Sequence, residues 1–288
     1  MGKIIQLPAL LANQIAAWEV VERPISVVKE LVENSLDAGC DSIKIELENG
    51  WIDLIVVSDT GDWIEKDDLA LITKKHTTSK ITSLEDLQKV MTFWFRWEAI
   101  ASIASVSDLE IISKHTDSIH GYSLKNETIS QSPIDSGTKV IVHNLFSKTP
   151  ARLNYLKKPR TEYLKIQEFI QKMALAYPEI EISLFHDDKK TLHFLSRQTL
   201  RGRIYEIYWD ELVDNLLELK HEFAGITIHG MISNPCISFP NKNRQSIFVN
   251  NRSIMSPLIQ KSISDAYNRF IAHGTFPCYI VFVELDPK

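Results

Sequence analysis

The chain has 288 residues, enough for about two domains of about 150 residues each. Its 44% hydrophobic and 24% charged residues are typical of a globular protein, and its net charge of −5 argues against binding nucleic acid through bulk positive charge. Three widely separated cysteines, Cys40, Cys236 and Cys278, make neither a disulfide framework nor a metal-ligand spacing. We therefore expect a reducing, cytoplasmic setting. Because no stretch approaches about 20 apolar residues, we also expect no membrane span.

The first part of the chain alternates between helical and strand-like patterns. A helix is expected at residues 24–38, with Pro24 in its first turn and Gly39 after its end. Strands are expected at residues 43–48 and 52–58, joined across Asn49-Gly50. The elements predicted next are a short helix at 67–73, a polar segment at 76–92 typical of a mobile lid, a helix at 98–105, strands at 109–113, 120–124 and 139–144, a helix at 163–176 and a strand at 180–185.

A domain boundary is expected near residues 200–203. It divides the chain into a first domain at 1–203 and a second at 204–288. In the second domain we predict helices at 212–219 and 257–273 and strands at 225–232, 245–249 and 278–285. The chain stops just after a strand, so we expect this domain to be incomplete at its C-terminus.

Two polar residues on the first predicted helix suggest a nucleotide site. Glu30 and Asn34 are four residues apart and therefore point the same way. A carboxylate can activate a water molecule, and an amide oxygen can hold Mg²⁺. Taken alone, the pair is weak evidence, because an ordinary solvated helix face has the same pattern.

Six motifs carry a resemblance to a known family. They are ANQIAAWEVVERP at 12–24, KELVENSLDAG at 29–39, DTGDW at 59–63, HTTSK at 76–80, FWFRWEA at 93–99 and TPAR at 149–152. In order and spacing they resemble the N-terminal ATPase region of the MutL family of DNA mismatch-repair proteins, one branch of the GHKL ATPases. The Glu-x-x-x-Asn and Asp-x-Gly elements are common to GHKL proteins. The Phe-Arg-x-Glu-Ala and Thr-Pro-Ala-Arg elements are specific to the MutL type.

The resemblance implies a fold and a set of roles. The fold is α/β: a Bergerat (GHKL) sandwich with an N-terminal arm and an ATP lid at about 76–98, then a smaller, truncated ribosomal-S5-domain-2-like α/β domain. Glu30 would be the general base, Asn34 the Mg²⁺ ligand and Asp59 the acceptor for the adenine amino group. The other residues implied to contact ATP are Ala38, Gly61, Trp63, Leu71, Thr78, Ser79, Lys80, Trp94, Phe95, Arg96, Trp97 and Thr138.

The resemblance also implies partners. ATP would switch an association with a second copy, in which residues 4–15 act as an arm. Mismatch-recognition proteins and downstream repair enzymes would be further binding partners. Non-specific contact with the DNA backbone would be salt-dependent. Its candidate residues are Arg152, Lys157, Arg160, Arg244 and Arg252, followed by Lys158, Arg201, Arg203 and Lys242. The alternative is that these cations are ordinary surface residues.

All six tryptophans occupy unexpected positions. The family has glycine where Trp18, Trp63, Trp94 and Trp97 stand, and by a looser alignment also at Trp51 and Trp209. Glycine itself is scarce, at 10 residues against an average of about 7%. We hypothesise that these are UGA codons read as glycine in the source lineage and translated here as tryptophan. The alternatives are a degenerate paralogue or scaffold that binds no ATP, and another GHKL ATPase of the topoisomerase or chaperone type.

Overall fold

The computed structural model describes residues 20–74, 97–208 and 212–286, which belong to two compact units. Unit 1 comprises residues 1–170 and 180–193, and unit 2 comprises residues 171–179 and 194–288. The mixed α/β class expected from the sequence is confirmed in both units.

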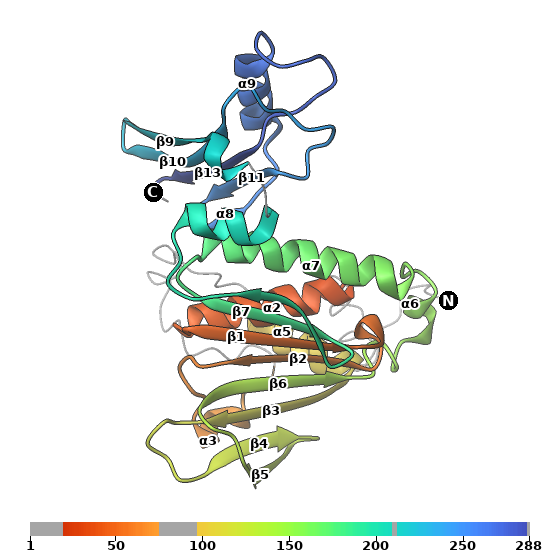
Figure 1. Cartoon of the computed structure of the whole chain (residues 1–288). Helices are drawn as coiled ribbons and strands as arrows, with labels where there is room; N and C mark the ends of the chain where they lie inside the picture. The colour runs from red at the N-terminus through yellow and green to blue at the C-terminus, as the bar shows by residue number, and fades with distance from the viewer. Residues whose placement is uncertain (1–19, 75–96, 209–211, 287–288) are drawn as a thin grey trace, which may run out of the picture. The chain divides into compact units, whose positions relative to one another are not determined.

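Unit 1 contains an eight-stranded sheet in the order β5-β4-β3-β6-β2-β1-β7-β8 (Figure 1). β1 pairs with β7 in parallel, and the pairs that lead from β1 through β2, β6, β3 and β4 to β5 are antiparallel. The strands are β1 Ser42–Glu48, β2 Leu54–Asp59, β3 Asp108–Lys114, β4 Gly121–Lys125, β5 Thr128–Ser132, β6 Gly137–His143, β7 Glu181–His186 and β8 Lys189–Phe194.

Helices α2 (Pro24–Asp37) and α5 (Trp97–Val106) contact each other and lie on one face of this sheet, α2 against β2 and α5 against β3 (Figure 1). α2 buries Val27, Val28, Leu31 and Val32, which recur at helical spacing and so share one side. The other helices are α3 (Lys66–Leu69), α6 (Pro150–Leu153) and α7 (Pro159–Ala176). α7 runs from unit 1 into unit 2.

The turn between β1 and β2 has an unusual backbone. The short 3-10 segment Asn49–Trp51 contains Asn49 at φ 50°, Gly50 at φ 76° and Trp51 at φ 146°. A bulky side chain at such a φ is strained, whereas glycine adopts it freely. Trp51 is also 3% exposed, and its indole nitrogen is buried without a hydrogen-bond partner among the described residues.

Unit 2 contains a five-stranded sheet in the order β12-β11-β13-β10-β9. Its elements are α8 Leu200–Tyr208, a 3-10 turn Val213–Asn215, β9 Leu216–Phe223, β10 Ile226–Ser233, β11 Gln245–Val249, β12 Arg252–Ser253, α9 Pro257–Tyr267 and β13 Tyr279–Glu284. β11 and β13 are parallel neighbours with α9 between them in the chain, as expected of a βαβ-like unit. The described part of unit 2 has two hydrophobic clusters. The first contains Phe248 and Phe282 together with Ile204 of α8. The second contains Ile247 and Tyr279, and Ile259 of α9 packs against it.

Several sequence predictions are wrong in detail. Residues 212–219, predicted as a helix, form a 3-10 turn and the start of β9, because eight backbone positions from Leu216 to Phe223 pair with β10. The helix predicted to end at 273 ends at Tyr267. Strands β5 and β8 and helix α8 were not predicted.

Candidate functional site

A cavity of about 320 Å³ opens in unit 1 between α2, the loop after β2, strand β6 and helix α5. Its floor is apolar, formed by Leu31, Val57, Ile100, Ile111 and Val140. Its polar lining includes Asn34, Asp37, Asp59, Asp62, Glu65, Asp68 and Thr138. An apolar cavity of this size with a few convergent polar groups is typical of a small-molecule site.

Asp59, the last residue of β2, is held by two donors. The Ser35 hydroxyl donates to Oδ2 at 2.7 Å, and the Gly61 backbone N–H donates to Oδ1 at 3.0 Å. Burial raises the pKa of Asp59 and outweighs the opposing effect of these hydrogen bonds. The result is a fixed acceptor for a ligand N–H inside the cavity.

Two glycines allow the backbone to close tightly beside Asp59. A Cβ on Gly61 would lie 2.7 Å from the carbonyl oxygen of Ala38, and the Asp62 N–H donates to that same oxygen at 2.8 Å. Gly137 has φ 82°, and a Cβ there would lie 2.1 Å from the carbonyl oxygen of Asp59. Neither position has room for a side chain, so the Asp-Thr-Gly motif has a steric reason for its glycine.

Of the helix pair predicted from spacing, Asn34 is among the residues that line the cavity and Glu30 is not. Glu30 lies on the same helix at 7% exposure. No group of three or more His, Cys, Asp or Glu side chains able to hold a metal occurs in the described part of the chain. Mg²⁺ keeps several waters and is commonly held by one or two protein oxygens together with substrate phosphates. The Asn34 amide oxygen therefore fits such a metal.

Trp63 also lines the cavity. Its side chain is 37% exposed, its Nε1 donates to Glu65 Oε1 at 3.0 Å, and its ring stands edge-on to His115 with 3.6 Å between centroids. The indole therefore takes up space at the cavity wall where a glycine would leave room for a ligand.

The remaining predicted nucleotide contacts are placed differently. Ala38 lines the cavity, whereas Leu71 is 43% exposed and is not part of the lining, which includes the adjacent Ile72. Trp97 begins α5. Thr78, Ser79, Lys80, Trp94, Phe95 and Arg96 lie outside the described residues.

The candidate DNA contacts fall into three groups. Lys157, Lys158, Arg160, Lys242 and Arg252 are exposed. Arg152 lies over the Phe146 ring at 5.3 Å, and Arg244 lies over Phe239 at 4.1 Å. Arg203 is corrected from a candidate contact to a structural residue: it is 0% exposed and donates to Leu195 O at 2.6 Å and Pro178 O at 2.8 Å. Arg201 donates to Val213 O at 2.6 Å and so has a structural role too.

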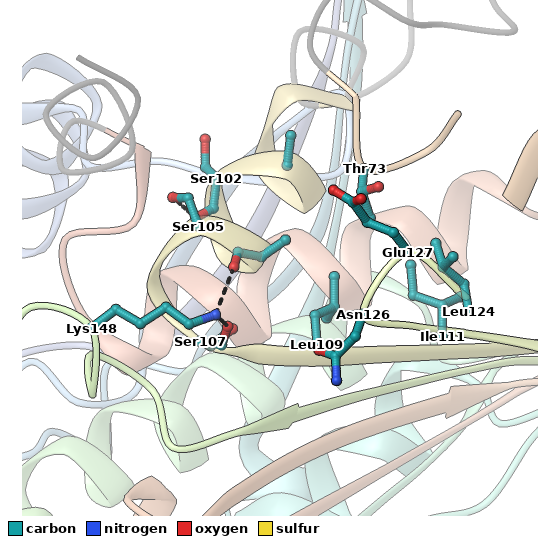
Figure 2. Close-up of a pocket in the computed structure, with 12 residues that line it drawn as sticks. Thr73, Ser102, Ser105, Ser107, Leu109, Ile111, Leu124, Asn126, Glu127 and Lys148 are labelled. Carbon is teal, nitrogen blue, oxygen red and sulfur yellow. Dashed lines mark hydrogen bonds between the residues drawn. The ribbon is translucent and has the colours of Figure 1, made fainter. Parts of the chain in front are cut away.

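A second cavity of about 340 Å³ lies beside α5 and the β4–β5 turn (Figure 2). Lys148 reaches its edge, but its ammonium donates to Ser107 O at 2.5 Å and to Ala104 O at 3.5 Å, and it pairs with Asp108 at 3.3 Å. Ser105 donates to Ser102 O at 2.7 Å. These contacts complete the C-terminal end of α5. The Lys148 ammonium and the Ser105 hydroxyl are therefore satisfied within the chain, and we assign no ligand to this cavity.

Sequence reasoning missed two residues at the first cavity, Ser35 and Ser113. Ser35 binds the Asp59 carboxylate, and Ser113 of β3 accepts a hydrogen bond from the Ile64 N–H at 2.8 Å. The signal for Ser113 was present in the strand pattern. Leu109, Ile111 and Ser113 alternate on one face of β3, so a serine stands where the apolar series would continue.

Two family models match the chain. "Histidine kinase-, DNA gyrase B-, and HSP90-like ATPase" matches residues 22–145, and "DNA mismatch repair protein, C-terminal domain" matches residues 204–288. The described residues include no helix that is both long and apolar enough to cross a membrane.

The relatives and solved structures agree with these matches. DNA mismatch repair protein MutL of Xanthomonas axonopodis pv. citri is 40% identical over 99% of this chain and 46% of its own length, and that of Halothermothrix orenii is 40% identical over 100% and 45%. The chain thus spans about half the length of these relatives.

Among solved structures, the N-terminal domain of a DNA repair protein superposes with a TM-score of 0.82 at 26% identity, covering 98% of this chain and 89% of that one. The Aquifex aeolicus MutL ATPase domain complexed with ADP gives a TM-score of 0.69 at 30% identity, covering 93% and 94%. The predicted GHKL-type fold is therefore confirmed. The chain belongs to the MutL family of DNA mismatch repair proteins.

Proposed function

We propose that this chain is the ATPase module of a MutL-type mismatch repair protein and that the 320 Å³ cavity binds the adenine end of ATP. The observation that carries the proposal is Asp59, a carboxylate held by Ser35 and Gly61 in a cavity with an apolar floor. An aromatic base with an exocyclic amine fits this arrangement, because its faces need apolar contact and its N–H needs an acceptor. The solved relative with bound ADP supports nucleotide binding at such a domain.

The phosphates would extend from the base toward Asn34 and Glu30. Asn34 supplies an amide oxygen for a Mg²⁺ ion, which when bound offsets the charge of the phosphates. Glu30 lies one helical turn away with the carboxylate that an attacking water requires. Their separation of four residues on one face of α2 keeps the metal ligand and the base aligned.

Glu30 is tested in a chain with Trp63, Trp94 and Trp97 replaced by glycine. Glu30→Ala is expected to retain ATP binding and to lower the rate of ATP hydrolysis by about 10²–10⁴-fold, the usual contribution of a general base. Glu33→Ala is the matched control, because Glu33 is a second buried acid on α2, one residue before Asn34 and paired with Lys29 at 3.9 Å. Hydrolysis that survives Glu30→Ala, or falls equally in both variants, contradicts the assignment.

The wider role follows from family membership and is part of the proposal. ATP would order the lid and the arm at residues 4–15, so that two copies associate, and the switch would engage mismatch-recognition and downstream repair proteins. The exposed cations Lys157, Arg160 and Arg252 would contact the DNA backbone without sequence preference.

A second candidate function is a MutL-type scaffold that binds no nucleotide. The observation in its favour is Trp63, whose side chain lines the cavity. The six codons separate the two candidates. UGA at all six positions agrees with glycine in the functional protein, whereas UGG at positions 63, 94 and 97 makes the tryptophans genuine and favours the scaffold.

A further inference from the structure

Ser113 connects two residues of the cavity lining although it does not itself line the cavity. It is 1% exposed on β3, directly opposite Thr138 of β6 in the strand register. Its Oγ accepts the Ile64 N–H at 2.8 Å, lies 3.0 Å from Thr138 Oγ1, and lies 3.3 Å from Gly137 O. Ile64 and Thr138 both line the cavity.

The single hydroxyl proton of Ser113 determines the state of Thr138. Because the Ile64 N–H occupies one lone pair of Ser113, the serine proton points toward either Thr138 Oγ1 or Gly137 O. Thr138 is the nearer acceptor. When Ser113 donates to Thr138, the proton of Thr138 is free to point into the cavity. When Ser113 donates to Gly137, Thr138 can donate to the remaining lone pair of Ser113, and in that state it offers only a lone pair to a ligand.

Whether the Thr138 hydroxyl donates or accepts affects which ligand fits, because Asp59 and Thr138 lie side by side. The two residues are register partners on β2 and β6, so their side chains offer neighbouring groups to a ligand. Asp59 accepts, and Thr138 as oriented by Ser113 donates. A 6-aminopurine presents an N–H next to a ring-nitrogen acceptor and matches this pair. A 6-oxopurine presents an acceptor next to an N–H and is mismatched at both points.

We propose that Ser113 is a positioning residue that directs the Thr138 hydroxyl into the cavity and thereby makes the site prefer a 6-aminopurine over a 6-oxopurine nucleotide. This inference rests on the proposed nucleotide site and adds the origin of its base selectivity. In a buried network, the loss of one partner allows the remaining hydroxyl to reorient. Without Ser113, Thr138 can donate or accept as the ligand demands.

The test compares dissociation constants for ATP and GTP in the chain with Trp63, Trp94 and Trp97 replaced by glycine. Ser113→Ala is expected to lower the preference for ATP over GTP by about threefold to tenfold, the range of one hydrogen bond. Ser113→Thr keeps a hydroxyl and is expected to restore the preference. Ser123→Ala is the matched control, because Ser123 is 5% exposed on β4 and its hydroxyl pairs with that of Ser130 at 3.0 Å, away from the cavity.

Thermal unfolding of each variant separates selectivity from stability. Ser113→Ala and Ser123→Ala are expected to lower the melting temperature similarly, with only Ser113→Ala changing the ATP-to-GTP ratio. A parallel loss of affinity for both nucleotides, with the ratio intact, overturns the inference and leaves Ser113 a structural residue. If the parent binds neither nucleotide, the proposed function fails, and the inference fails with it.

Discussion

Trp51 and Trp63 are two tryptophans in one domain, and they conflict with different parts of the molecule. Trp51 is buried in the β1–β2 turn at φ 146° with an unpartnered indole nitrogen among the described residues, so it conflicts with its own backbone. Trp63 has no positive φ, is 37% exposed, and hydrogen-bonds Glu65, so its backbone is ordinary. Its indole would instead occupy space that a ligand needs, because it lines the cavity. A glycine can thus be required by the fold at one position and by the ligand at another.

The largest expected effect is on ATP binding, which tests whether tryptophan obstructs the ligand. Replacing Trp63, Trp94 and Trp97 with glycine is expected to convert undetectable ATP binding into measurable binding, because removal of the Trp63 indole restores space at the cavity wall and the family has glycine at the other two positions. Trp51→Gly alone is the control and should leave ATP binding undetectable. The measurement is titration of each variant with ATP in the presence of Mg²⁺. Tight binding by the unaltered chain contradicts the claim that the indoles obstruct the site.

Whether the backbone of the β1–β2 turn requires glycine is tested by comparing glycine with alanine at position 51. Both substitutions remove the indole, at a cost of about 3–5 kcal/mol for lost packing, but only alanine retains a Cβ at φ 146°. Trp51→Gly is therefore expected to be more stable than Trp51→Ala by about 1–3 kcal/mol. Chemical denaturation of the two variants measures this difference directly. Equal stability, or a more stable alanine variant, shows that the turn does not require glycine.

The smallest expected effect is the same comparison at position 63. Because Trp63 has no positive φ, alanine restricts the unfolded chain without straining the folded one. Trp63→Ala is expected to be more stable than Trp63→Gly by about 0.4–1 kcal/mol, opposite in sign to the result at position 51. Denaturation curves for the two variants give the value. The same sign at both positions would remove the distinction drawn between the two tryptophans.

Periodicity predicted most of unit 1 because its elements have strong local signals. The apolar face of α2 and the strands around Asn49-Gly50 could be read directly. The structure of residues 212–219 could not be read in this way, because the spacing of their leucines fits both a helix and a strand. Pairing with β10 is what makes most of this segment a strand.

The motif residues proposed for the site could be read from the sequence, whereas the hydroxyl network could not. Glu30, Asn34 and Asp59 belong to motifs with fixed spacing. Ser113 reaches Thr138 only because β3 and β6 are neighbours, and the chain between them does not encode that pairing locally. The strain at Trp51 is likewise a property of the folded turn, since a sequence contains no φ value.

The pairing of Asp59 with Thr138 on adjacent strands also bears on the order of events when a ligand enters. Both groups are part of a hydrogen-bonded ladder before any ligand arrives, so almost no conformational entropy is lost there on binding. Any ordering cost falls instead on the parts of the site outside the sheet. A nucleotide would then dock by its base on groups that already hold their positions in the sheet. The rigid sheet would therefore set the affinity for the base.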